Sequence, residues 1–267
     1  YYWTFPKLTN SLGVNVGGDI TTLLDYNTKF TSLPDKCFMR MFSQNANLYS
    51  AEKLHFGEVK QFREYTLTRM FENCTYLSYP PKITEGYKPY GKGSFAAMFK
   101  NCTSLIDIPF NEITLANSYA YNEMFYHCTS LNKVPVISAT SVGEGSFEGM
   151  YQGCTSLRTA PNFDTIIAVH KFGCQLMFSG CKNLVNVPAI LPAMTLSPYA
   201  YEYMFSGCSS MTKAPDLPAL VVPDECYGSM FRYCTSLQSF PKMDFVETVE
   251  TIGKYDCCTN MFQDCKN

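Results

Sequence analysis

The sequence has little net charge, few histidines and no long apolar run. Its 21 Lys and Arg residues nearly balance its 23 Asp and Glu residues, which leaves a net charge of -2. Without a field of one sign, there is no electrostatic basis for binding nucleic acid, so we expect no nucleic-acid partner. No apolar stretch approaches the ~18 residues of a membrane span, and Tyr1 to Ile20 lack the basic start and apolar run of a signal peptide. We therefore expect no direct membrane insertion of this segment.

Catalytic motifs are also missing. The histidines His55, His127 and His170 follow no catalytic spacing, and no Ser-His-Asp, nucleophile-elbow or HExxH arrangement occurs. The carboxylates are scattered along the chain. Cys257 and Cys258 are the start of an irregular cysteine cluster, but no His lies nearby to complete a zinc site. We predict a non-enzymatic protein with no catalytic residues, no cofactor and no metal site.

What the sequence does contain is an internal repeat, marked by a Met followed by an aromatic residue. Successive units are 26 to 31 residues apart. Cys follows the Met by four positions, Leu or Met by seven and Pro by eleven, and positions are given below as offsets from this Met. Such a pattern predicts a stack of similar units in which each unit buries its apolar residues against its neighbours. The repeated Mets are Met70, Met98, Met124, Met150, Met177, Met204, Met230 and Met261.

A divergent unit precedes these, with Met41-Phe42, Asn45 at the Cys position and Leu48 at the Leu position. We therefore assign residues 1–30 to an N-terminal cap or the end of a preceding region. Residues 31–267 form about nine units, the first divergent and the last truncated. Because the chain begins with Tyr1 and stops partway through a unit, we expect a fragment of a longer protein.

The residues at offsets -4, -3, 0, +1 and +4 are small or apolar, as in Ala120, Tyr121, Met124, Phe125 and Cys128. These offsets trace one face of a helix, so we predict a helical segment of about two turns with this face in the core. The cysteine at +4 is then a small, buried, reduced core residue.

From the Leu at +7 to the Pro at +11 the pattern is apolar, two variable residues, apolar, Pro, as in Leu131 to Pro135. The residue before a proline favours extended backbone, so this segment predicts a very short strand. Copies of it stacked side by side form a parallel sheet.

The run Met98-Phe99-x-x-Cys102-Thr103-Ser104-Leu105, repeated with an apolar-Pro step, resembles the BspA-like leucine-rich repeats of bacterial surface proteins, which are also found in phage proteins. The resemblance covers Thr31 to Asn267. It implies an array, usually on cell-surface or secreted proteins, that binds host proteins, other cells or matrix. The fold class we predict is an α/β repeat: a leucine-rich-repeat solenoid with short parallel strands on one face and short helical segments on the other.

Two outward columns, at offsets +8 and +9, vary strongly from unit to unit while the positions around them do not. Such variation on a sheet face is what a recognition surface shows, so we predict ligand binding there. The candidate residues are Tyr79, Asp107, Lys133, Arg158, Asn186, Lys213 and Gln238.

The predicted function is a non-enzymatic recognition or adhesion domain, extracellular or on a cell surface, with a protein or glycan ligand. One alternative is a receptor-binding or decoration domain of a phage virion. Another is a substrate-binding appendage of a larger carbohydrate-active enzyme. Flanking sequence would discriminate among the three, and the oligomeric state stays open.

Overall fold

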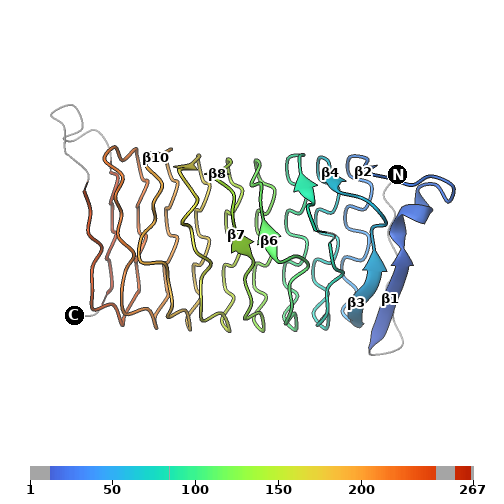
Figure 1. The fold of residues 1–267 in the computed structure, drawn as a ribbon. Helices are drawn as coiled ribbons and strands as arrows, with labels where there is room; N and C mark the ends of the chain where they lie inside the picture. Colours follow the sequence, from blue (N-terminus) through green and yellow to red (C-terminus); the bar gives the residue numbers. More distant parts are fainter. Residues whose placement is uncertain (1–12, 84, 245–255, 266–267) are drawn as a thin grey trace.

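The computed structural model describes residues 13–83, 85–244 and 256–265, and it shows a stack of similar coils (Figure 1). Each coil carries one of the repeated Mets. The divergent unit of Met41 is a coil of the same kind, with Met41 and Phe42 buried. The first strand, β1 (Val14–Asp19), pairs in parallel with β3 (Leu48–His55) at the N-terminal end of the stack.

The prediction of short parallel strands is confirmed. Besides β1 and β3, every strand of the described chain has two residues, and each pairs in parallel with a strand of a neighbouring coil. At the Leu-to-Pro segment, however, the pairing is reduced to isolated bridges such as Thr159–Asn186, because the following Pro cannot donate a ladder hydrogen bond. The two-residue strands are β2 (Ser32–Leu33), β4 (Gln61–Phe62), β5 (Lys88–Pro89), β6 (Glu112–Ile113), β7 (Val136–Ile137), β8 (Ser141–Val142), β9 (Ala168–Val169) and β10 (Thr195–Leu196).

The predicted helical segments are wrong. In the described part of the chain the one helical element is η1, a single 3-10 turn at Ile20–Leu23. Around each repeated Met the chain instead forms a series of tight turns, which we call the turn ribbon and define as offsets -5 to +4. In one unit Gly145, Gly149 and Gly153 have φ of 58°, 58° and 74°. Left-handed residues at every fourth position are incompatible with an α-helix.

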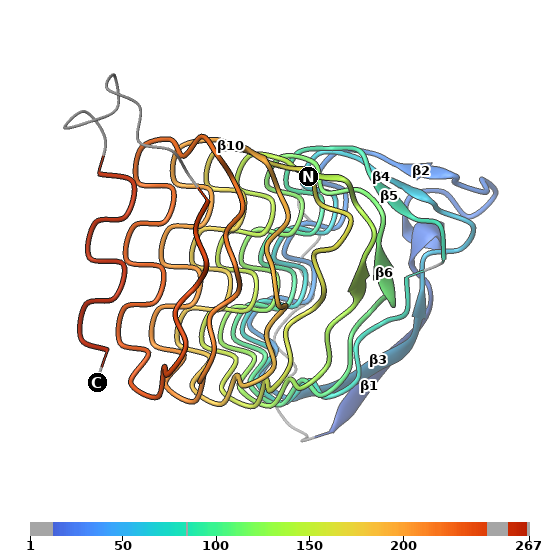
Figure 2. The same cartoon turned by 60° about the vertical axis from the view of Figure 1, so that its left-hand side comes forward.

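Alternate amides of the turn ribbon bond in two directions. The amide of Met150 donates to the carbonyl of Phe147 in its own coil at 3.1 Å, whereas the amide of Tyr151 donates to the carbonyl of Met177 in the next coil at 2.9 Å. The same alternation runs through the other ribbons, which together form the waved face in Figure 2. Half of the ribbon's amides therefore depend on a neighbouring coil.

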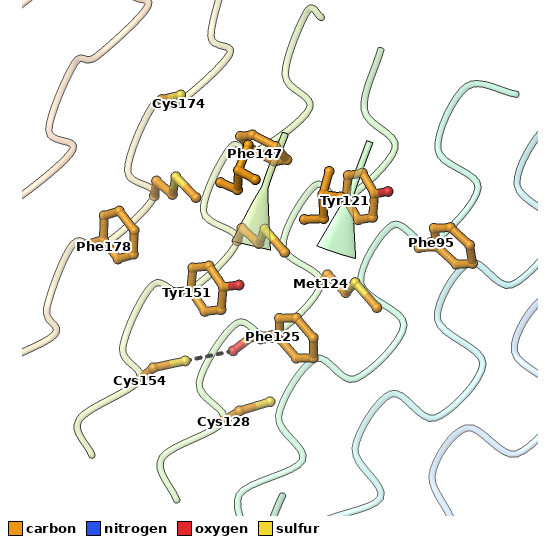
Figure 3. Packing of buried hydrophobic residues seen from close by; sticks show 14 of the residues in the cluster. Phe95, Tyr121, Met124, Phe125, Cys128, Phe147, Tyr151, Cys154, Cys174 and Phe178 are labelled. Carbon is orange, nitrogen blue, oxygen red and sulfur yellow. Dashed lines mark hydrogen bonds between the residues drawn. The ribbon is translucent and has the colours of Figure 1, made fainter. Parts of the chain in front are cut away.

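The core prediction is confirmed. Tyr121, Met124, Phe125, Cys128 and Leu131 are fully buried, and the equivalent residues of the other complete units are buried as well. The aromatic rings at offset +1 stack from coil to coil (Figure 3). The ring centroids of Phe125 and Tyr151 are 5.5 Å apart, with ring planes 12° from parallel.

Each cysteine at offset +4 connects its coil to the preceding one. The Sγ of Cys154 donates to the carbonyl oxygen of Phe125 at 3.0 Å (Figure 3), and the other seven make the equivalent bond at 3.0 to 3.2 Å. Burial raises the pKa of the Cys74 and Cys181 thiols to about 12, which keeps them protonated as donors. All thirteen cysteines are free thiols, in line with the predicted role as small core residues.

A carboxylate in place of a repeated cysteine should unfold the stack. We expect Cys154→Asp to lower the free energy of unfolding by roughly 3–5 kcal/mol, because it leaves a charge without a partner in the core. Denaturant unfolding would measure this. The control is Ser156→Asp, two residues away and exposed, which should melt like the wild type. Equal stability of the two variants would contradict the core position of Cys154.

Replacing a glycine of the turn ribbon by alanine should change the stability in the opposite direction from the same change in a helix. Gly149 lies mid-ribbon with φ 58°, so Gly149→Ala should destabilise the protein by about 1–2 kcal/mol. In a helix interior the same change would stabilise it by ~0.5–1 kcal/mol. Gly149→Asn should be milder than Gly149→Ala, because Asn tolerates the left-handed conformation better. Thermal and denaturant unfolding would decide between the two signs.

Candidate binding surface

The seven candidate residues lie on the outside of the stack, in two adjacent columns across consecutive coils. Tyr79 and Asp107 are partly buried, and the other five are exposed. We call these two columns, at offsets +8 and +9, the strand-face columns. Neighbouring coils are held in register here by backbone bonds: the amides at 185 and 186 donate to the carbonyl of Arg158 at 3.0 Å. The side chains therefore project from a fixed backbone.

One charged cluster forms within the columns. The carboxylate of Asp107 accepts hydrogen bonds from Lys82 Nζ at 2.8 Å and from Lys133 Nζ at 3.0 Å. Partial burial by itself would raise the pKa of Asp107, but the two ammonium groups and the amide of Ile108 outweigh it and lower that pKa to about 2. The cluster connects two column residues, Asp107 and Lys133, and adds Lys82, which the sequence pattern did not point to.

The remaining candidates are less closely connected. The side-chain amide of Asn186 donates to the hydroxyl of Thr159 at 3.1 Å, and the ring of Tyr79 lies 5.6 Å from that of Tyr49. Arg158 and Lys213 make no ion pair with another described residue. The structure thus places the seven residues in two adjacent columns, and none of them lines one of the pockets of the described chain. This geometry suits a broad contact with a partner surface.

A separate feature, which the sequence analysis did not predict, is a groove formed by the residues that precede the turn ribbon. It lies beside β8, near the upper edge in Figure 1, and has a volume of about 520 Å³. Its lining comes from offsets -11 to -6 of consecutive units, where the residue types change from unit to unit, so no single column revealed it. We call it the polar groove, and its lining includes Ser118, Thr140, Ser141, Glu144, His170, Lys171 and Ser197.

Potential metal ligands are dispersed over the described part of the chain. Within the described residues no cluster of His, Cys, Asp and Glu side chains is arranged to hold a metal ion. Among the carboxylates, Glu123 accepts a hydrogen bond from Lys100 Nζ at 2.6 Å and Glu148 one from Asn122 Nδ2 at 3.0 Å. The same described part contains no helix that is long and apolar enough to cross a bilayer.

Stacked coils joined by short parallel strands, with a core of one residue set per coil, define a leucine-rich repeat protein. The model of the BspA type leucine rich repeat region matches residues 20–158 and 174–267, in six copies. The chain belongs to this family.

Two solved structures resemble the chain. A leucine rich cell surface protein of Faecalibacterium prausnitzii A2-165 is 15% identical, with 93% of this chain and 91% of that one covered and a TM-score of 0.40. A leucine-rich repeat protein of Bacteroides ovatus ATCC 8483 is 17% identical, with 89% and 84% covered and a TM-score of 0.25. No curated protein matches the sequence.

The Asp107 cluster should make the stability of the protein depend on pH in the acidic range. Because the pKa of Asp107 is lowered from 3.8 to about 2, its stabilising effect is present above pH 3.8 and is lost as the pH falls towards 2. The variant Asp107→Asn should therefore lose less stability than the wild type over this interval. Thermal unfolding between pH 5 and pH 2 measures the difference, and parallel curves would contradict the cluster.

Proposed function

We propose that this chain is a non-enzymatic recognition domain, exposed at a cell surface, which binds a protein through the strand-face columns. The proposal rests on the outward side chains of the strand-face columns, which project from a backbone fixed by hydrogen bonds between coils. A rigid row loses little conformational entropy on binding, because its backbone is already ordered before the partner arrives.

The chemistry of the columns favours a protein partner. They present acidic Asp107, basic Lys133, Arg158 and Lys213, and uncharged Asn186 on one surface. A mixture of signs complements the mixed surface of a protein better than it complements a polyanion, which requires a uniformly basic face. Arg158 is exposed and has no ionic partner among the described residues, so it is available to a partner's carboxylates.

The cysteines are compatible with a location outside the cell. Burial raises the pKa values of the Cys154 and Cys208 thiols well above the ordinary value of a cysteine. A thiol that stays protonated and inaccessible is a poor substrate for oxidation or disulfide exchange. The buried cysteines at offset +4 can therefore stay reduced in an oxidising compartment.

The test removes three column cations together. The variant Lys133→Ser, Arg158→Ser, Lys213→Ser should fold normally and bind at least about tenfold more weakly to whichever member of a panel of immobilised extracellular-matrix proteins the wild type binds. Biolayer interferometry measures the affinity, and circular dichroism checks the fold.

The matched control is Lys60→Ser, Arg63→Ser, Lys88→Ser, which removes the same charge from exposed positions outside the columns. It should bind like the wild type. If both triple variants weaken binding equally, the effect is one of net charge and the columns are not the site. A wild type that binds no protein of the panel would argue against the proposed function.

A further inference from the structure

The polar groove crosses several coils and carries hydroxyl groups that the protein itself does not use. The lining comes from the units of Met124, Met150, Met177 and Met204. Neighbouring coils are about 4.8 Å apart, so an extended ligand lying along the groove could contact four coils in succession. In the described chain, the side-chain hydroxyls of Ser118, Ser141 and Ser197 make no hydrogen bond to another residue. The groove is therefore rich in donors and acceptors that are open to a ligand.

The aromatic ring of Tyr119, which follows the lining residue Ser118 in the chain, is held in place by three contacts. The hydroxyl of Tyr119 donates to the carboxylate of Glu144, a lining residue, at 2.9 Å. The ring packs on the backbone of Gly145, where a Cβ atom would approach it to 2.4 Å. The ammonium group of Lys92 lies 4.7 Å from the ring centroid. Tyr119 is half-buried, so part of its ring remains accessible.

Two further aromatic rings, Phe172 and Tyr199, lie two and three coils beyond Tyr119 at the same offset from the repeated Met. The rings of Phe172 and Tyr199 stack with centroids 5.2 Å apart. Lys171, which lines the groove, places its Nζ 4.8 Å from the centroid of Phe172. Both rings are half-buried. Tyr119 and Phe172 directly follow the lining residues Ser118 and Lys171 in the chain, so fixed aromatic rings border the open hydroxyl groups of the groove.

The charges of the groove do not select for a charged ligand. Glu144 is engaged with Tyr119, and Lys171 lies against an aromatic ring. The lining therefore contains one acidic and one basic side chain, Glu144 and Lys171, together with His170. A polyanion would need several unengaged cations in a row, which the lining lacks.

We propose that the polar groove binds a neutral glycan chain. Sugar hydroxyls would hydrogen-bond to Ser118, Ser141 and Ser197, and C–H groups of the sugar would contact the exposed parts of the Tyr119 and Phe172 rings. This ligand matches the groove better than an apolar peptide does, because most side chains of the lining are polar. The site is separate from the strand-face columns and does not depend on their function.

The test titrates the whole chain with cellohexaose, xylohexaose, mannohexaose and chitohexaose as neutral probes and with a heparin hexasaccharide as the anionic one, using calorimetry. At least one neutral probe should bind. The variant Ser118→Ala, Ser141→Ala, Ser197→Ala should weaken that binding about tenfold or more, because a site that hydrogen-bonds hydroxyls loses most when its polar groups are removed. Its melting temperature should be unchanged.

The matched control is Ser130→Ala, Ser156→Ala, Ser210→Ala, three serines just after the Cys end of the turn ribbon, which should bind like the wild type. Tyr119→Ala should weaken binding strongly and Tyr119→Phe less, because Phe keeps the ring. The column variant at Lys133, Arg158 and Lys213 should bind the glycan normally, which separates this proposal from the preceding one. Absence of binding by every neutral probe, or binding of heparin alone, or an undiminished affinity of the triple serine variant, would overturn it.

Discussion

The structure depends on the backbone hydrogen bonds that the turn ribbon makes with the next coil. Because every second amide donates out of its own coil, a coil without a neighbour would leave those amides unsatisfied. The ribbon can point them outward only by placing a left-handed residue at every fourth position, as at Tyr119, Glu123 and His127. For residues other than Gly this conformation costs roughly 1–2 kcal/mol, comparable with the ~1 kcal/mol net gain of a hydrogen bond. The stacked core must supply the rest of the stabilisation.

The fixed register of the coils explains the composition of the core. Residues at one offset lie directly over one another, so the same planar ring at +1 can stack throughout, as Phe178 and Phe205 do at 5.6 Å. The cysteine at +4 is small enough to fit beneath this stack, and its thiol donates to a carbonyl of the preceding coil. In the divergent first unit Asn45 occupies this position, and its amide donates to the carbonyl of Phe42 at 3.0 Å. A donor at this position is thus retained when the cysteine is not.

The sequence predicted the repeat, the core and the outward columns, but it misled on the helical segments. The apolar offsets -4, 0 and +4 recur every four residues, and over two turns this period is hard to separate from the ~3.6 of a helix. The spacing of Gly145, Gly149 and Gly153 was the available signal, since three glycines four apart are unfavourable in a helix and favourable at left-handed positions. The bridge from Lys82 to Asp107 could not be predicted, because it joins different offsets of different coils. The polar groove escaped for the same reason.

The two surfaces illustrate how such a stack can support separate binding chemistries. The columns follow the Cys end of the turn ribbon, whereas the groove precedes its first residue, so the ribbon separates them along the chain. Since the column residues and the polar residues of the groove lie outside the core, each can change without altering the coil that carries it. A ligand lying along the stack would contact several coils at once and would bind only while they remain in register. Such a ligand would therefore stabilise the inter-coil hydrogen bonds on which its own site depends.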